Sequence, residues 1–402
     1  MLFPVSKLSQ AVPALAPPPF RVSPLRLALV RCGDVVCSVF LHVNRRSEFV
    51  FGAAGKLQRR AAVERKLTAF QWPIHFDFNL RVGAFDGAND PGQYDQELFL
   101  AVRDWEPYFT ANMDDDDDDT HDGPLLEKPA VMNTEPDGLE VGSMTYSIND
   151  KALGSGDPIR VREGQRLLVH FLNASAIENR RIAMAGHKMR VIAMDGNAAP
   201  APQLVDSIFL GAGERIDAEI EMKNPGIWIL GSTEKPIRDA GLGVVVEYGG
   251  QRMQPQWVDP PKTRWDYSIF GSTGWSSPPA QQTIEMTFEK IPGGAGKFNL
   301  WLVNGKPYPH DREFVLQEGV RYRLVMHNRT DDAHPMHLHR HLWELKEING
   351  KAMAGVIKDT VVVPYYGRAT VDFTADRPGL ALFNCHIQQH MDYGFKALFR
   401  YA

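Results

Sequence analysis

The sequence is poor in cysteine, which limits the frameworks that can hold its fold. Only three cysteines occur in 402 residues. Cys32 and Cys37 lie close together near the start, whereas Cys385 stands alone near the end. A network of disulfides is therefore excluded. For Cys32 and Cys37 we expect free thiols, with a small loop disulfide or a metal-binding pair as the alternatives.

A strong charge of one sign and long apolar runs are also missing. The 44 basic and 49 acidic residues leave a net charge of −5, which implies no general attraction to nucleic acid or to an anionic membrane. No 18-residue apolar run is free of charge, so we expect no membrane span. The 44% hydrophobic and 23% charged residues are typical of a globular protein with two or three domains.

The first 70 residues differ from the rest. They hold eleven Lys/Arg against three Asp/Glu and include a proline-rich stretch at Pro13–Pro19. Charges interrupt the apolar run Leu25–Val43, so it lacks the core of a signal peptide. A targeting segment is one interpretation; we favour a disordered arm and a misplaced start. We treat 1–85 as an atypical basic leader with a remnant of a first domain.

From about Asp86 onward, short runs rich in Val, Ile, Leu and aromatic residues alternate with turn residues, which predicts an all-β fold of sandwiches or barrels. The strands that we expect include Glu97–Val102, Arg166–Leu172, Met189–Met194, Ile216–Glu221 and Gly243–Tyr248. The six aspartates Asp114–Asp119 would repel one another in a strand or helix, so we expect a solvated loop there, with an acidic metal site as the alternative.

An internal repeat divides this part of the chain. Asn149 and Asn304 are each followed fourteen residues later by Glu-Gly and twenty-four residues later by another asparagine. Asp206 and Asp359 stand at equal distances before a Pro-Gly pair. We predict two copies of one β-domain, at 86–253 and 281–402, joined by the linker 254–280.

The two copies differ in their polar residues. Ser232 in the first copy takes the position of Cys385, and His187 aligns with His341. The first copy therefore has the scaffold without metal ligands, and the second copy has both.

Six of the 13 histidines fall in two short segments of the second copy, His334–His341 and Asn384–His390. A soft thiolate with two imidazoles suits a trigonal copper site, and His334 and His390 can supply the imidazoles beside Cys385. Alternation along a strand turns His337 and His339 to one side. These two and His386 then face a second metal centre, with the backbone from Cys385 to His386 joining the two.

Each of the other histidines has a simpler explanation. We expect ordinary surface or core roles for His42, His75, His121, His170, His187, His310 and His327. His341 is expected to be structural or to support a metal ligand, because its counterpart His187 persists where no metal can bind.

The segments His-Pro-Met-His-Leu-His and Asn-Cys-His-Ile-Gln-Gln-His resemble the third and fourth copper motifs of the multicopper oxidases, a family of laccases, copper-efflux oxidases and ferroxidases. The resemblance extends from about Asp86 to Ala402 and includes Tyr94–Trp105, which is similar to the exit from the family's first domain. It implies tandem cupredoxin-like, Greek-key domains, copper as the cofactor, a small-molecule or metal-ion reductant, and dioxygen as the acceptor if a trinuclear site forms. Family members are mostly exported, so a periplasmic or secreted location is expected.

The resemblance also implies a role for each ligand. The type 1 copper would be bound by His334, Cys385 and His390, with Phe395 at the axial position. His337 would bind the type 2 copper, and His339 and His386 the type 3 pair; Cys385 and His386 would carry electrons between the centres.

Two departures from the family pattern stand out. Asn384 replaces a type 3 histidine, and no His-x-His pair occurs outside His337–His341, although the family's first domain supplies two. We therefore expect that domain to be truncated or replaced, and type 1 copper to be favoured over type 2 and type 3.

Three functions follow. The first is a laccase-like oxidase that removes single electrons from its substrate. The second is a blue-copper electron-transfer or copper-binding protein with the type 1 site alone, and the third is a scaffold without copper. The sequence does not name the reductant, and a chain without a first domain could form an oligomer.

Overall fold

The computed structural model describes residues 93–110, 137–251, 253–309 and 313–402 with their side chains, together with the backbone of five earlier strands. Contacts divide the chain into two compact units, Met1–Gln58 and Arg59–Ala402. The first unit holds one antiparallel sheet of β1 (Arg26–Cys32), β2 (Val35–Val43) and β3 (Phe49–Ala53). The second unit begins with the hairpin of β4 (Val63–Gln71) and β5 (Ile74–Val82).

Strands before Asp86 were not expected from the sequence, although Val35–Val43 is rich in the β-branched and aromatic residues that favour them. The side chains of Cys32, Cys37, His42 and His75 lie outside the described residues, as do Asp114–Asp119, His121 and His310. The interpretations given for them stay predictions.

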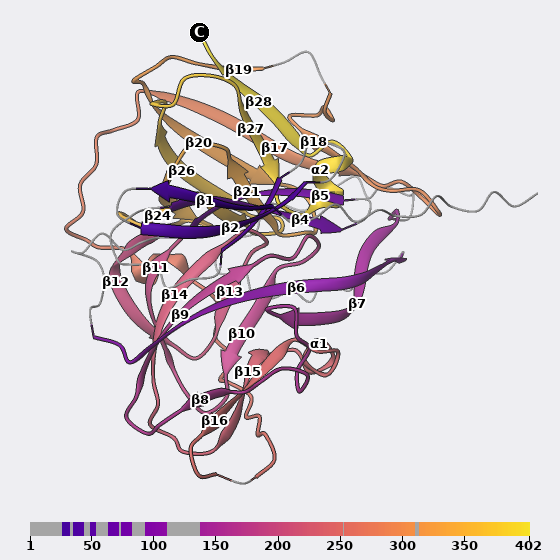
Figure 1. The fold of residues 1–402 in the computed structure, drawn as a ribbon. Helices are drawn as coiled ribbons and strands as arrows, with labels where there is room; N and C mark the ends of the chain where they lie inside the picture. The colour runs from indigo at the N-terminus through magenta and orange to yellow at the C-terminus, as the bar shows by residue number, and fades with distance from the viewer. Residues whose placement is uncertain are drawn as a thin grey trace, which may run out of the picture. The chain divides into compact units, whose positions relative to one another are not determined.

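The first copy of the repeat folds into two sheets (Figure 1). The six-stranded sheet has the order β12-β11-β14-β9-β6-β7, and the five-stranded sheet has the order β13-β10-β15-β16-β8. Their strands are β6 (Gln96–Thr110), β7 (Glu140–Ile148), β8 (Ile159–Val161), β9 (Arg166–Asn173), β10 (Arg180–Met184), β11 (Met189–Met194), β12 (Asn197–Val205), β13 (Ile208–Leu210), β14 (Arg215–Glu221), β15 (Ile227–Ser232) and β16 (Gly243–Tyr248), with the short helix α1 (Lys235–Asp239).

The second copy repeats this topology strand for strand. One sheet has the order β18-β17-β20-β26-β22-β23 with β24 beside β22, and the other has the order β19-β28-β27-β21-β25. A 3₁₀ helix, η2 (Tyr267–Phe270), precedes them. The strands are β17 (Gln282–Ile291), β18 (Leu300–Val303), β19 (Phe314–Leu316), β20 (Arg321–Asn328), β21 (His334–Leu338), β22 (Trp343–Ile348), β23 (Lys351–Ala352), β24 (Ile357–Lys358), β25 (Thr360–Val363), β26 (Arg368–Thr374), β27 (Ala381–Cys385) and β28 (Lys396–Tyr401), with the helix α2 (Gln388–Asp392).

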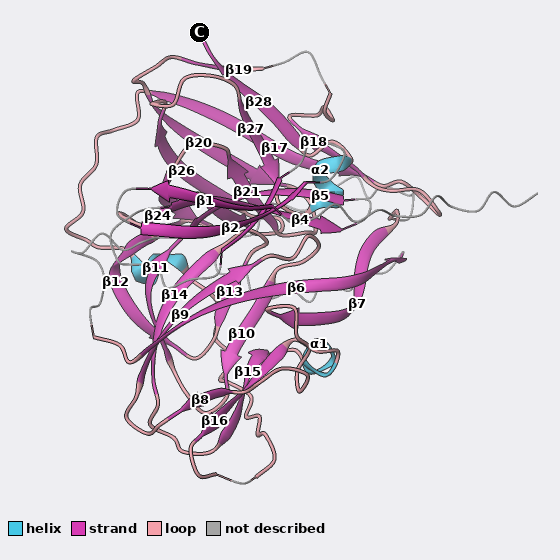
Figure 2. Ribbon diagram, viewed as in Figure 1, coloured by secondary structure: helices cyan, strands magenta, loops and turns pink. Residues whose placement is uncertain are grey.

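The predicted all-β fold class is confirmed, since the described chain consists mainly of strands (Figure 2). All five strands expected from the first copy are present, and two of them, Met189–Met194 and Gly243–Tyr248, have the expected bounds. None of the helices in the described part of the chain is long and apolar enough to cross a membrane.

Alternating side chains explain why these segments form strands around a core. In β20, Tyr322, Leu324 and Met326 are almost completely buried, whereas the residues between them are partly exposed. A strand turns successive side chains to opposite faces, so a period of two buries one face only. Each such side chain contributes about 1.5–3 kcal/mol when it leaves water.

Two pairs of asparagines that mark the sequence repeat occupy equivalent corners. Asn149 and Asn304 have positive φ angles of 53° and 52°, and their side chains each bridge two backbone groups, in β6 and in β17 respectively. Asn173 and Asn328 each donate from Nδ2 to one carbonyl in the loop that follows and to a second carbonyl, at the end of β13 or directly after β25. The repeat in the sequence therefore reflects repeated backbone hydrogen bonding as well as a repeated apolar pattern.

Candidate metal centre

Three buried side chains from three elements meet in the second copy. His334 begins β21, Cys385 ends β27, and His390 lies in α2. Strands β21 and β27 are antiparallel neighbours with Met336 opposite Cys385, so His334 projects from the same face as the thiol. Cys385 Sγ lies 3.9 Å from Nδ1 of His334 and 3.8 Å from Nδ1 of His390. Their ligand atoms all lie within 4.8 Å of one another.

Burial favours the neutral forms of Cys385 and His334. His334 and Cys385 are fully buried and His390 is 3% exposed. Burial raises the pKa of the Cys385 thiol, and burial, with His390 and Lys290 nearby, holds the pKa of His334 well below its usual value. A metal that binds here displaces the thiol proton and meets an imidazole that is already neutral. One soft thiolate with two imidazoles fits copper.

Aromatic rings enclose the two imidazoles. The ring of Trp301 lies 3.9 Å from that of His390, centroid to centroid, and meets His334 edge to face at 5.0 Å. Phe395 meets His334 edge to face at 4.7 Å, and its backbone bonds to both Cys385 and His390. A phenyl ring offers no ligand atom, so Phe395 fixes the spacing of the centre and excludes water from it.

The histidines predicted for a second centre lie on the opposite face. The ring of His337 is 4.8 Å from that of His339 and 5.2 Å from that of His386, centroid to centroid. Nδ1 of His337 bonds to the carbonyl of Asp359 at 2.6 Å. Among the described residues, however, His334, Cys385 and His390 form the single group of three whose ligand atoms come together.

Asn384 occupies the edge of this second cluster. Nε2 of His339 donates to Oδ1 of Asn384 at 3.2 Å, and Nδ2 of Asn384 donates to the carbonyl of Cys385 at 2.8 Å. The carboxamide therefore engages Nε2 of His339. Together with three histidines, an amide oxygen does not fit a cluster of three coppers, because copper prefers imidazole to amide ligands.

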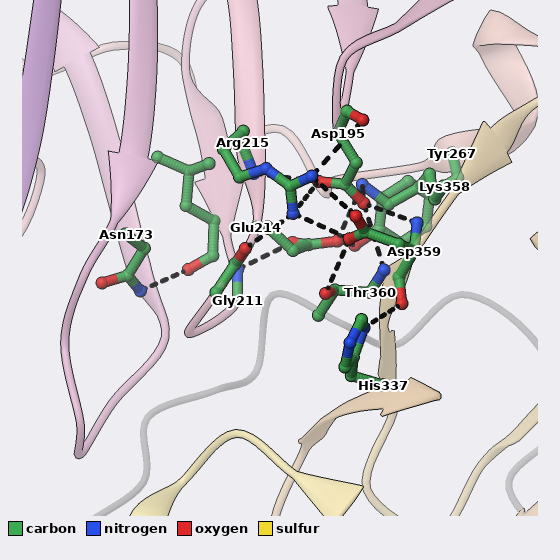
Figure 3. A network of polar contacts seen from close by, with 12 residues as sticks. Asn173, Asp195, Gly211, Glu214, Arg215, Tyr267, His337, Lys358, Asp359 and Thr360 are labelled. Atoms are coloured by element: carbon green, nitrogen blue, oxygen red, sulfur yellow. Dashed lines mark hydrogen bonds and ion pairs between the residues drawn. The ribbon is translucent and has the colours of Figure 1, made fainter. Parts of the chain in front are cut away.

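A buried network of charges supports His337 from behind (Figure 3). Asp195, Glu214 and Arg215 come from the first copy, and Lys358 and Asp359 from the second. The guanidinium of Arg215 donates to both carboxylate oxygens of Asp359 at 2.7 Å, and Lys358 Nζ lies 3.0 Å from Asp195 and 3.1 Å from Glu214. These ion pairs join the two copies beside the second cluster.

Backbone contacts tighten the same junction. The amides of Asp359 and Thr360 both donate to Oδ2 of Asp195 at 3.2 Å. The Cα of Gly213 lies so near His386 that an added Cβ would come within 2.9 Å of the ring. The first copy therefore covers His386 and fixes the backbone segment whose carbonyl holds His337.

The Arg215–Asp359 pair predicts a loss of stability in acid. Burial raises the pKa of Asp359, but Arg215 outweighs it and leaves the pKa below its usual value. A depressed pKa stabilises the fold above the unfolded-state pKa and loses that contribution as the pH falls below about 4. We expect Asp359→Asn to lower the free energy of unfolding by about 3–5 kcal/mol at neutral pH and by less near pH 3, as denaturant titrations at several pH values can measure.

Asp206 provides a matched control for Asp359, because it is the counterpart in the first copy and pairs with the exposed Lys188 at 3.1 Å. Asp206→Asn should cost less than about 1 kcal/mol at any pH. A difference between wild type and Asp359→Asn that does not change with pH would contradict the role given to the ion pair.

The first copy, in which Ser232 takes the position of Cys385, is the copper-free copy, and it shows which parts of the site belong to the shared scaffold. Nε2 of His187 bonds to the hydroxyl of Tyr248 at 2.7 Å, as Nε2 of His341 bonds to that of Tyr401. Both histidines therefore make the equivalent hydrogen bond to a tyrosine hydroxyl. Ser232 is buried in β15 and pairs with β10, as Cys385 in β27 pairs with β21.

The remaining described histidines have local partners. His170 lies between Asp217 at 2.6 Å and Glu97 at 3.2 Å, and His327 pairs with Glu285 at 2.8 Å. Neither they nor His187 belong to the described group of metal-ligand atoms.

Several neighbours of the site were not identified from the sequence. They are Thr330 and Trp301 beside the first three ligands, Glu140 beside His390, and the charge network behind His337. The sequence contains a partial indication of Thr330, because this residue follows the repeat asparagine Asn328 by two positions. Nothing in the sequence indicates Glu140, because it is far from His390 along the chain.

Comparisons with known proteins agree with this geometry. Two family models, both described as multicopper oxidase, match residues 104–247 and 275–402. Multicopper oxidase MmcO of Mycobacterium tuberculosis is 25% identical over 327 residues, which cover 76% of this chain and 62% of the relative. Iron transport multicopper oxidase fio1 of Schizosaccharomyces pombe is 23% identical over 374 residues, covering 77% and 56%. The chain thus spans roughly three fifths of the length of these two relatives.

Solved structures show the same fold. Fet3p, a multicopper oxidase that functions in iron import, superposes with a TM-score of 0.56 at 16% identity, covering 79% of this chain and 67% of that one. A laccase from Pediococcus acidilactici gives a TM-score of 0.53 at 18% identity, covering 76% and 60%. With family models that together match more than half of its residues, this chain belongs to the multicopper oxidase family.

Proposed function

We propose that His334, Cys385 and His390 bind a type 1 copper that accepts one electron at a time from a phenol or a metal ion. The approach of one thiol and two imidazole nitrogens within 4.8 Å in a buried aromatic pocket carries this proposal. The copper would supply a one-electron redox couple. The protein's residues hold the ligands in place and exclude water from them.

The edge of His390 offers an entry for electrons. Its Nδ1 faces Cys385, while its Nε2 lies 3.8 Å from Oε2 of Glu140, whose side chain is 14% exposed. Gln389 donates to the carbonyl of Leu139 at 2.7 Å and so holds this segment of the first copy against α2. Only the imidazole of His390 would lie between the copper and a reductant that reaches Glu140. Cys385 and His386 would carry electrons onward to a dioxygen-reducing centre.

A second function is favoured by the contact between His339 and Asn384. Because the carboxamide engages His339, the described histidines do not fit a trinuclear cluster without further ligands. The alternative is an electron-transfer or copper-binding protein that carries the type 1 site alone. The two functions differ in the copper that each chain retains.

Copper content after reconstitution and removal of loose metal separates these functions. About one copper per chain with intense blue absorption indicates the type 1 protein, and roughly four indicates an oxidase whose remaining ligands lie outside the described residues or in a partner chain. Elemental analysis with absorption spectroscopy measures both. Copper without blue absorption would overturn the type 1 assignment.

Asn384→His tests the cluster further. If other ligands are absent, the added imidazole should not start oxygen consumption, because one more ligand cannot complete the centre. Recovery of oxygen uptake, measured with an oxygen electrode, would show that the remaining ligands are present.

A further inference from the structure

The ring nitrogen of His334 that points away from the thiol has a specific partner. Oγ1 of Thr330 lies 2.7 Å from Nε2 of His334. Thr330 is 2% exposed and His334 is fully buried, so no solvent competes for this contact. The opposite nitrogen, Nδ1, is the one that faces Sγ of Cys385.

The surroundings of Thr330 determine which group donates. Oδ1 of Asn328 lies 2.8 Å from the hydroxyl oxygen, and the carbonyl oxygen of Asp332 lies at 3.3 Å. Both of these oxygens only accept, because Nδ2 of Asn328 is already directed to the carbonyls of Asp332 and Pro364. The single hydroxyl proton therefore goes to one of them, which leaves a lone pair of Oγ1 to accept from His334.

We propose that Thr330 is a positioning residue that keeps the proton of His334 on Nε2, so that the lone pair of Nδ1 points at the metal beside Cys385. A neutral imidazole carries one proton, and its partner decides which nitrogen holds it. The other tautomer would place a proton where the metal must bind. This role rests on the type 1 site proposed above, but the tautomer itself exists without copper.

The copper-free copy uses the same corner differently. Ser175 follows Asn173 by two residues, as Thr330 follows Asn328, and both backbone amides donate to the asparagine Oδ1 at 3.0 Å. The Ser175 hydroxyl, however, donates to Asp104 and accepts from the amides of Ile177 and Glu178. Arg180 takes the position that corresponds to His334, since it begins β10 as His334 begins β21. The hydroxyl at this corner thus serves an imidazole only where the thiol is also present.

The metal-free protein gives the first test. Nitrogen-15 NMR of the His334 ring should show the proton on Nε2 in the wild type and in Thr330→Ser, which keeps the hydroxyl. Thr330→Val keeps the shape but cannot accept, so it should give a mixture of tautomers or the Nδ1–H form. The Nε2–H form unchanged in Thr330→Val, in a protein whose circular dichroism shows it to be folded, would overturn the proposal.

Copper(II) titration gives the second test. Loss of a hydrogen bond to a ligating histidine weakens metal binding about 10- to 100-fold, so Thr330→Val should bind copper(II) that much more weakly and shift the blue absorption band. Thr330→Ser should restore both, and Ser175→Ala should change neither.

The outcomes of the two tests are separable. A wild type that takes up copper without blue colour would refute the type 1 site and leave the tautomer result standing. If wild type and Thr330→Val are both blue and have the same copper(II) affinity and the same spectra, the role of Thr330 is refuted and the type 1 site stands.

Discussion

Cys385→Ser is expected to remove all blue colour and all electron transfer from the reductant. The thiolate supplies the ligand-to-copper charge transfer that makes such centres blue, and a serine hydroxyl is both harder and far less acidic. The site is fully buried, so no other soft ligand or solvent anion can replace the sulfur. Absorption and electron paramagnetic resonance spectra of the copper-reconstituted variant measure the loss, together with single-turnover oxidation of a phenol or of ferrous ion.

Ser232→Ala is the matched control, because Ser232 is buried at the corresponding position of the copper-free copy. It should keep the full colour and the full copper content. Both variants change a single side-chain atom at the end of a buried strand, so a general effect on folding would appear in both. Blue colour retained in Cys385→Ser would refute the assignment of the thiol as a copper ligand.

The largest effect on stability is expected at Lys358. Its ammonium is fully buried between the carboxylates of Asp195 and Glu214, and the hydroxyl of Tyr267 donates to Glu214 at 2.6 Å. Lys358→Met keeps the length of the side chain, leaves Glu214 without its cation and leaves Asp195 with Arg215 alone, at 3.6 Å. Removing one partner of a buried ion pair costs about 3–5 kcal/mol, so we expect the free energy of unfolding to fall by this amount at neutral pH.

The loss should depend on pH in a defined direction. Burial already raises the pKa of Glu214, and Lys358 opposes that increase, so the variant raises it further. A carboxyl group with a raised folded-state pKa binds its proton more tightly when folded, and acid therefore favours the folded variant. The difference between variant and wild type should shrink as the pH falls from about 7 toward the ordinary glutamate pKa of about 4.3.

Two variants sharpen this test in denaturant titrations. Lys235→Met removes the ion-pair partner of Asp239; the side chain of Lys235 is 75% exposed and that of Asp239 is 59% exposed. This control should lower the free energy of unfolding by less than about 0.5 kcal/mol. Adding Glu214→Gln to Lys358→Met should recover part of the lost stability, because it removes the carboxylate that has lost its cation. A Lys358→Met protein as stable as wild type would mean that the network contributes nothing to the junction of the two copies.

Short-range patterns made much of the fold predictable. Short runs rich in Val, Ile, Leu and aromatic residues between turn residues, such as Met189–Met194 and Gly243–Tyr248, predicted strands with their observed bounds, because these residue types favour strands locally. The helix that carries His390 was not predicted. It has only five residues, which is too short to show a helical period. Its N-cap residue, Ile387, has no side chain that can cap the helix, so no capping pattern indicates it either.

The sequence by itself determined the all-β class, the repeat and the residue types of the candidate metal centre, because these depend on spacing within a strand or a short motif. The tertiary structure alone decided how those residues are used. Cys385 and His334 are 51 residues apart, and the pairing of β21 with β27 brings them together. The contact of Asn384 with His339 and that of Thr330 with His334 depend on where the rings point. Such orientations are set by strand register and by buried polar groups that must find partners, and these arise only when distant segments pack.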